Sequence, residues 1–249
     1  MEWGEQSGKY LMCPLSRYAY SVDPNPWDWL TTREKAEEMA VEVAGWRNSY
    51  GIDGIDLDIE AGAGDKAEAG PNLVHFIRKL KSLQPGLVVS QPSYGYPQVK
   101  AEIDVINASW NVGGSSNGLA ESVGIMVYEG TQSLQYVKNF AQGSSQWEGF
   151  PITVSIENCS KAKTVKTPTF YSKVDVPTTG ILVGCKGSSR QSDIMTLASE
   201  SIKQDLLGMM VWFCSVQGGL QYESSWDCSG SEESSNAYVE AMKYLNANS

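Results

Sequence analysis

Acidic side chains recur at every second position of one short segment, residues 53–60, which read DGIDLDIE. Because successive side chains of a β-strand point to opposite faces, a strand here separates an acidic face from an aliphatic one. The acidic face carries Asp56, Asp58 and Glu60. Neighbours on one face of a strand lie about 6.6 Å apart, so three ionised carboxylates repel one another. We therefore expect at least one of them to hold a proton near neutral pH, as a catalytic acid must.

Two other interpretations compete with a catalytic site. The first is an edge strand whose acidic face meets solvent, but the aliphatic opposite face and the surrounding pattern favour a covered parallel sheet. The second is a Mg²⁺ or Ca²⁺ site, because clustered carboxylates suit hard cations. The spacing does not match an EF-hand loop. Five cysteines without CxxC spacing and a single histidine offer no zinc set either, so we expect no metal and no cofactor.

The elements that must position these acids follow from the hydrophobic pattern. Strand-length apolar runs alternate with helix-period segments along the whole chain, which is typical of a parallel α/β sheet or barrel. Thr31 and Glu34 are expected to open the first helix as a capping pair, and Gly51 to end it. Strands are expected at 10–15, 54–60, 87–91, 124–128, 152–156, 181–185 and 209–213, and later helices at 72–83, 97–110, 192–204 and 236–245.

Three segments together resemble one known family. The acidic strand resembles the DxxDxDxE signature of the family 18 glycoside hydrolases, which are chitinases and endo-β-N-acetylglucosaminidases. Residues 126–129, MVYE, resemble that family's Met-x-Tyr-Asp strand end, and residues 208–212, GMMVW, resemble its final strand, which ends in a tryptophan. Order and approximate spacing agree over roughly residues 10–215. The resemblance implies an α/β fold of the TIM (β/α)8 barrel type with its site at the C-terminal strand ends.

The resemblance also implies a role for each matched residue. Glu60 would be the general acid on the glycosidic oxygen in a retaining, substrate-assisted hydrolysis. Asp58 would orient the substrate's acetamide N–H and stabilise positive charge, with support from Asp56. Tyr128 would hydrogen-bond the acetamide oxygen, and Trp212 would form a hydrophobic floor under the sugar. We further assign substrate binding to Met126, Glu129, Gln91 and Tyr94, and support of the motif to Asp53 and Gly54.

The implied function is hydrolysis of β-1,4-linked N-acetylglucosamine glycans, such as chitin, by one catalytic domain spanning residues 1–249. The alternative is a non-catalytic, lectin-like chitooligosaccharide-binding or storage protein. The intact Glu60 favours a hydrolase, because lectin-like relatives commonly lose that acid. An assay with a fluorogenic N-acetylglucosamine oligomer separates the two functions.

Two departures from the family pattern affect these expectations. Glu129 stands where the family usually has Asp or Asn, which affects substrate preference. Only 52 residues precede Asp53, although the family places this motif on the fourth strand. We therefore expect an N-terminally truncated barrel that lacks its first two strands. The run at 181–185 is then a surplus strand that could complete an altered barrel.

Composition narrows the range of partners. A net charge of −10 without clustered Lys or Arg gives no electrostatic footprint for nucleic acid or an anionic membrane surface. No apolar stretch is long enough to span a bilayer, and the first ten residues do not have the layout of a signal peptide. We expect a monomer that binds an N-acetylglucosamine-containing oligo- or polysaccharide. The resemblance favours secretion.

Overall fold

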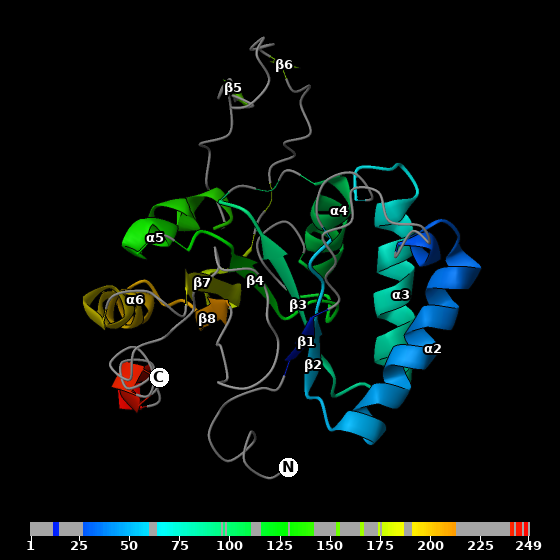
Figure 1. Cartoon of the computed structure of the whole chain (residues 1–249), viewed down its shortest axis with the longest axis horizontal. Coiled ribbons are helices and arrows are strands. Elements are labelled where there is room, and N and C mark those ends of the chain that lie inside the picture. The colour runs from blue at the N-terminus through cyan, green and yellow to red at the C-terminus, as the bar shows by residue number, and fades with distance from the viewer. Residues whose placement is uncertain are drawn as a thin grey trace, which may run out of the picture.

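The computed structural model describes residues 12–14, 27–59, 64–95, 97, 99–110, 116–128, 130–141, 153–154, 165–166, 174, 176–186, 191–212, 240–241, 243–245 and 247–248. In these residues the main sheet has six parallel strands in the order β1-β2-β3-β4-β7-β8 (Figure 1). They are β1 (Met12–Pro14), β2 (Gly54–Asp56), β3 (Val88–Ser93), β4 (Ser122–Ile125), β7 (Ile181–Lys186) and β8 (Gly208–Trp212). An all-parallel sheet with intervening helices is the α/β class that the sequence predicts.

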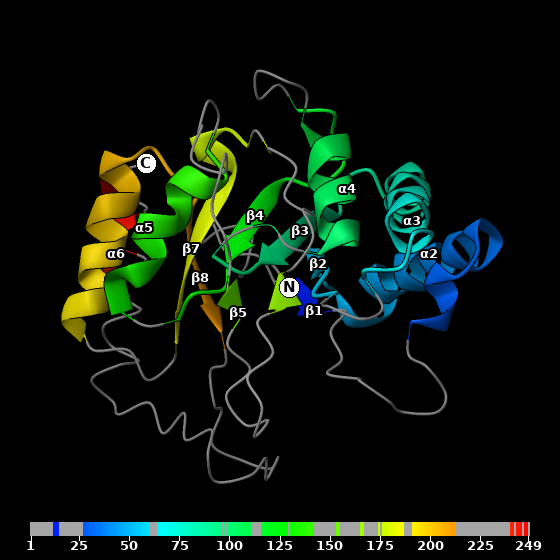
Figure 2. The same cartoon turned by 90° about the horizontal axis from the view of Figure 1, so that it is seen from above.

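Helices alternate with the strands along the chain. Figures 1 and 2 show α2, α3 and α4 beside the part of the sheet that β1, β2 and β3 form, and α5 and α6 beside the part that β7 and β8 form. The helices are α2 (Arg33–Tyr50), α3 (Ala69–Leu83), α4 (Lys100–Ser109), α5 (Ser133–Tyr136) and α6 (Gln191–Lys203), with 3-10 turns η1 (Asp28–Leu30), η2 (Gly130–Gln132), η3 (Val137–Asn139) and η4 (Thr178–Gly180). None of the described helices is both long and apolar enough to cross a bilayer.

The start of α2 differs by one residue from the sequence expectation. Thr32, not Thr31, is the N-cap, and its side chain accepts a hydrogen bond from the Lys35 amide at 3.3 Å. Thr31 instead ends η1, because its hydroxyl donates to the carbonyl oxygen of Asp28 at 2.6 Å. The expected pair of Thr31 and Glu34 is therefore wrong. At the other end Gly51 caps α2 with φ 66°, the left-handed conformation that glycine adopts readily.

The order of strands after β4 also corrects the sequence analysis. The run expected at 152–156 is β5 (Thr153–Val154), which pairs antiparallel with β6 (Val165–Lys166) and is separate from the main sheet. The run at 181–185 is not surplus, because β7 lies between β4 and β8 and pairs with both. Within the described residues β1 pairs only with β2, and β8 pairs only with β7. In the described part of the chain, β1 and β8 are therefore the two edge strands of the main sheet.

The core lies between the sheet and its covering helices. Ile55 of β2, Val89 of β3 and Val123 of β4 are fully buried, as is Phe76 of α3. Burying a side chain of this size typically contributes about 1.5–3 kcal/mol. Trp29 extends this layer outward, with its ring centroid 4.9 Å from that of Phe76. Ile55, Val89 and Val123 share one face of the sheet by register and alternation, and Asp56 and Ser90 lie on the opposite face.

Candidate active site

The acidic segment extends beyond the hydrogen-bonded end of β2. The Leu57 amide donates to the carbonyl oxygen of Ser90 at 2.9 Å, so pairing with β3 continues past Asp56. Leu57 is fully buried and Ile59 is 3% exposed, whereas Asp56 and Asp58 are half-buried. The predicted alternation is therefore confirmed as far as Ile59. We call residues 57–59 the β2 extension.

Asp56 lies in a partly enclosed, polar environment. Its register partner on β3 is Ser90, and the Ser90 hydroxyl donates a hydrogen bond to Asp56 Oδ1. Burial raises the pKa of Asp56 to about 6, the charge of Asp58 acts in the same direction, and the Ser90 hydrogen bond opposes both. This carboxyl group therefore takes up a proton at a higher pH than an ordinary aspartate. The direction agrees with the expectation that one acid of this face is protonated readily.

Asp58 follows on the same face, and its Oδ1 is shielded from solvent. The next residue of the acidic face, Glu60, lies outside the described residues, as does Glu129. Their functional roles stay predictions. The structure therefore establishes the first two positions of the acidic face and the direction of the chain that leads to the third.

The end of β4 brings the second motif to the same edge of the sheet. The Met126 amide donates to the carbonyl oxygen of Ser93 at 2.6 Å, so the chain still follows β3 after β4 ends. Met126 and Tyr128 are half-buried. Because all six strands are parallel, their C-terminal ends meet at one edge, which is where an α/β sheet places its ligand site. The sheet thus brings Tyr128 to the edge toward which the β2 extension runs.

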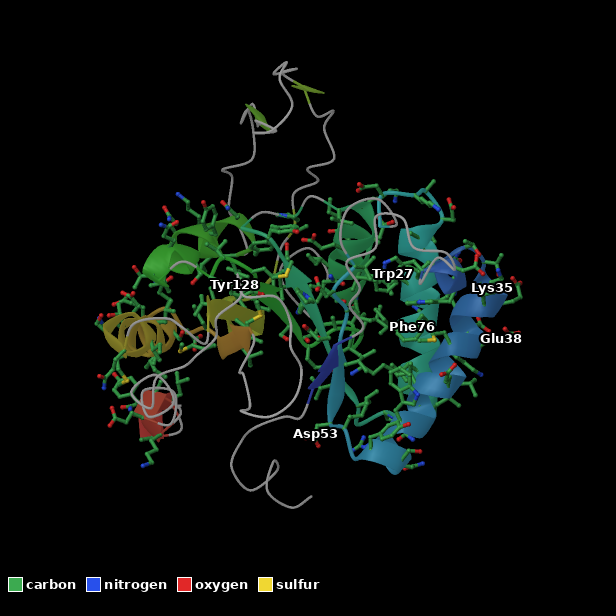
Figure 3. The ribbon with its side chains drawn as sticks, viewed as in Figure 1. Trp27, Lys35, Glu38, Asp53, Phe76 and Tyr128 are labelled. Atoms are coloured by element: carbon green, nitrogen blue, oxygen red, sulfur yellow. The ribbon has the colours of Figure 1, made fainter. Side chains whose placement is uncertain are left out.

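The two residues assigned to motif support lie at the other end of β2. Asp53 precedes β2, and its carbonyl oxygen accepts a hydrogen bond from the Val88 amide at 2.9 Å. Figure 3 shows Asp53 and Tyr128 well apart, with Asp53 at the lower end of the sheet in that view. Gly54 is the first residue of β2 and is buried. Both residues can therefore act on the site only through the strand.

Gln91 is placed differently from the other predicted substrate-binding residues. It is 1% exposed and, by alternation, shares a face with Ser93, whose hydroxyl donates to Glu102 of α4. The Gln91 amide nitrogen donates to the carbonyl oxygens of Leu57 and Pro92, both at 2.9 Å. In this structure Gln91 connects β3 to the β2 extension on the helix-covered side. Contact with substrate by Gln91 stays a prediction that this position does not favour.

Tyr94 and Trp212 also lie at strand ends. Tyr94 directly follows β3 and is half-buried. Trp212 is the last residue of β8, and its backbone pairs in register with Lys186 of β7. The Trp212 side chain lies outside what the structure describes. Substrate binding by either residue stays a prediction.

Sequence reasoning missed the residues that shape the inner face of the sheet, by which we mean the face that carries Asp56 and Ser90. Ser90 contacts Asp56 directly, and the parallel register of β2 and β3 would have paired them. Gly184 of β7 lies against the ring of Tyr128, because a Cβ atom added there would be 3.0 Å from Tyr128 Cε1. Small residues at inner positions of predicted strands were the available signal. No group of three or more His, Cys, Asp or Glu residues is arranged to hold a metal ion in the described part of the chain.

Comparison with known proteins finds likeness at the level of fold. No family model matches the sequence, and no curated protein matches it. Among solved structures, active domain 2 of the chitinase from Pyrococcus furiosus has a TM-score of 0.58 at 13% identity, covering 97% of this chain and 75% of that one. The C-terminal domain of Legionella pneumophila ChiA has a TM-score of 0.55 at 12% identity, covering 98% and 81%.

The GH18 chitinase ChiB from Flavobacterium johnsoniae gives a similar result, with a TM-score of 0.54 at 11% identity over 96% of this chain and 76% of that one. At such identities the likeness shows the fold alone. This chain therefore has an α/β fold similar to the barrel domains of GH18 chitinases.

Proposed function

We propose that this protein is a retaining glycoside hydrolase that cleaves β-1,4-linked N-acetylglucosamine glycans, with Glu60 as the general acid. The observation that carries the proposal is the acidic face of β2 and its extension. Asp56 and Asp58 share this face, while Ile55 and Leu57 on the opposite face are fully buried. The sequence continues the same alternation to Glu60. The chitinase-like fold and the strand-end position of Tyr128 support this function.

In the first proposed step the substrate supplies its own nucleophile. The carbonyl oxygen of the 2-acetamido group attacks the anomeric carbon, and the bond from that carbon to the glycosidic oxygen breaks. Glu60 donates its proton to the departing oxygen and becomes a carboxylate. The product of this step is a cyclic oxazolinium ion together with the released sugar. Charge is conserved, since the cation on the ring balances the new carboxylate.

In the second proposed step water reopens that ring. The Glu60 carboxylate takes a proton from a water molecule while the water oxygen attacks the anomeric carbon. The bond from the anomeric carbon to the acetamido oxygen breaks, which restores both the acetamide and the protonated Glu60. Two displacements at one carbon give net retention of configuration.

The neighbouring residues have supporting roles in this scheme. An ionised Asp58 accepts the acetamide N–H and stabilises positive charge as it develops. The raised pKa of Asp56, about 6, supports a division of labour, because a proton on Asp56 removes the repulsion that would otherwise act on Asp58. The Tyr128 hydroxyl donates to the acetamide oxygen, and Trp212 packs against the apolar face of the sugar.

The deciding experiment is an assay with a fluorogenic N-acetylglucosamine dimer and trimer, followed by NMR detection of the first anomer formed from the unlabelled pentamer. We expect release of the fluorophore and initial formation of the β-anomer. Binding of the pentamer without hydrolysis would favour the non-catalytic oligosaccharide-binding protein. Initial formation of the α-anomer would refute the retaining mechanism, and the absence of both binding and hydrolysis would refute both functions.

A further inference from the structure

Two glycines interrupt the inner face of the sheet on neighbouring strands, Gly124 of β4 and Gly184 of β7. A Cβ atom added at Gly124 would be 2.3 Å from the sulfur of Met210, which comes from β8. One added at Gly184 would be 3.0 Å and 3.1 Å from Cε1 and Cδ1 of Tyr128. The space that an ordinary side chain would fill is therefore occupied by Met210 of β8 at Gly124 and by Tyr128, which follows β4, at Gly184.

A Cβ atom at position 184 would meet a second neighbour in addition to the Tyr128 ring. A Cβ atom there would also be 2.3 Å from the carbonyl oxygen of Ile125, the last residue of β4. Contacts below 3.0 Å essentially never occur for a real Cβ atom, so any side chain at this position would displace its neighbours. Tyr128 lies three residues after Ile125, so both contacts act on the same strand end. The absence of a side chain at position 184 is therefore what lets the end of β4 lie where it does.

We propose that Gly184 is a positioning residue for Tyr128, which sets the place of the phenol ring and of its hydroxyl at the C-terminal edge of the sheet. This inference rests on the proposed function, in which the Tyr128 hydroxyl holds the acetamide oxygen during attack. Gly184 touches no substrate in this scheme and acts only through the ring. A shift of about 1 Å in such a group can lower a rate by about 100-fold.

The neighbouring strand limits how far the ring can move in response. Gly184 is paired in register with Met210, and the Met210 side chain already fills the space over Gly124. A methyl group at position 184 therefore cannot be accommodated by moving the ring toward Gly124, because the thioether lies there. We expect the ring to tilt away from β7 instead, which displaces the hydroxyl.

The experiment is a double-mutant cycle between Gly184→Ala and Tyr128→Phe, measured as kcat and KM on the fluorogenic oligomer. We expect Gly184→Ala to lower kcat about 10- to 100-fold with a much smaller change in KM. In the Tyr128→Phe background, where the hydroxyl is already missing, the same change should have little further effect. An equal loss in both backgrounds, or no loss in the wild type, would overturn the proposal. Gly45→Ala is the control, since a Cβ atom added at Gly45 has nothing within 4 Å.

Two further measurements test the proposal if the wild type is inactive or if Gly184→Ala does not fold. If the wild type hydrolyses nothing, the proposed function fails, and the positioning role is judged from the NMR ring signal of Tyr128, assigned through Tyr128→Phe. That signal should shift in Gly184→Ala and stay in place in Gly45→Ala; an unmoved signal in Gly184→Ala would overturn the inference.

If Gly184→Ala does not fold, the double variant that combines Gly184→Ala with Tyr128→Ala is made. Recovered folding supports the ring contact, and continued failure assigns the conflict to the Ile125 carbonyl and overturns the proposal.

Discussion

Interactions with opposite effects determine the pKa of Asp56. Burial and the charge of Asp58 favour its protonated form, while the hydrogen bond from Ser90 favours its ionised form. Burial dominates, and the pKa rises to about 6 from an ordinary value of 3.8. The folded protein therefore binds a proton at this carboxyl more readily than the unfolded chain does. This difference makes the stability of the fold depend on pH.

The first prediction concerns Asp56→Asn. Stability of the wild type should fall as pH rises from about 4 to about 6, because the unfolded chain loses this proton first. Above pH 6 the loss amounts to about 3 kcal/mol, from a shift of about two pKa units. Asparagine is neutral throughout and still accepts from Ser90, so Asp56→Asn should be more stable than the wild type at pH 7 and equal to it at pH 3.5. Urea denaturation at both pH values measures this, and an equal difference at both would contradict it.

The second prediction concerns Glu60→Gln. This change removes a transferable proton but little contact surface, so hydrolysis should fall by about 100- to 10,000-fold. Affinity for the N-acetylglucosamine pentamer, measured by calorimetry with the wild type and the variant, should stay nearly unchanged. Glu38→Gln is the matched control, because it makes the same chemical change at an exposed position on α2, where Figure 3 shows Glu38. Parallel losses of affinity and activity in Glu60→Gln would count against its role as the acid.

At the scale of elements, Gln91 links the strand that carries the acids to its neighbour. Its amide nitrogen donates to the Leu57 carbonyl, and Leu57 lies between Asp56 and Asp58 in the chain. The side chain is buried on the side of the sheet that α4 covers. Gln91 can therefore influence the direction of both carboxylates without facing a ligand itself.

The third prediction follows from this link. Gln91→Met keeps a similar volume but donates no hydrogen bond to Leu57 or Pro92, so we expect a loss of about 1–3 kcal/mol in stability. We also expect a lower kcat in the fully folded variant, since the β2 extension loses a fixed contact. Gln84→Met is the control, because Gln84 donates to the Ala44 carbonyl at 3.3 Å from the end of α3. Denaturation and kinetics should show that both variants lose stability and that only Gln91→Met loses activity.

Local pattern predicted most elements but not their partners. Apolar period located α3, α4 and α6 closely, because each has one buried face. A short apolar run located β3, in which five of the six residues are buried. The runs at 152–156 and 181–185 look alike as isolated strands. Which of them joins the sheet depends on pairing with β4, a contact between residues distant in the sequence. The cap of α2 was missed by one residue because Thr31 and Thr32 are both good capping residues.

In the candidate site, too, local pattern predicted the faces of the strands but not the contacts between strands. Alternation correctly separated Asp56 and Asp58 from their aliphatic neighbours, since that rule depends only on the strand period. The same rule would have placed Gln91 beside Val89 on the covered face. Ser90 and Gly184 were not predicted, because each matters through a contact with another strand.

Over the whole molecule, the parallel sheet limits where a pair of catalytic carboxylates can arise. In the six described strands Asp56 is the only acidic residue, and Asp58 follows it on the same face of the same segment. Enzymes that use a protein nucleophile place two carboxylates on opposite sides of the scissile bond, about 5–5.5 Å apart. Two alternate positions on one strand lie on the same side of the sheet, about 6.6 Å apart. The described strands thus offer no opposing carboxylate to attack the anomeric carbon.

The last prediction is that hydrolysis requires the N-acetyl group of the substrate. If the acetamido oxygen is the nucleophile, an oligomer of N-acetylglucosamine should be cleaved. The fully deacetylated glucosamine oligomer and a cellooligosaccharide of the same length should not be cleaved, because neither carries that oxygen. Product chromatography after incubation of each oligomer with equal amounts of enzyme measures this. The three oligomers share the same β-1,4 backbone, so a difference between them reports on the substituent at carbon 2. Efficient cleavage of the cellooligosaccharide would require attack by a protein side chain or directly by water, and it would rule out the substrate-assisted mechanism.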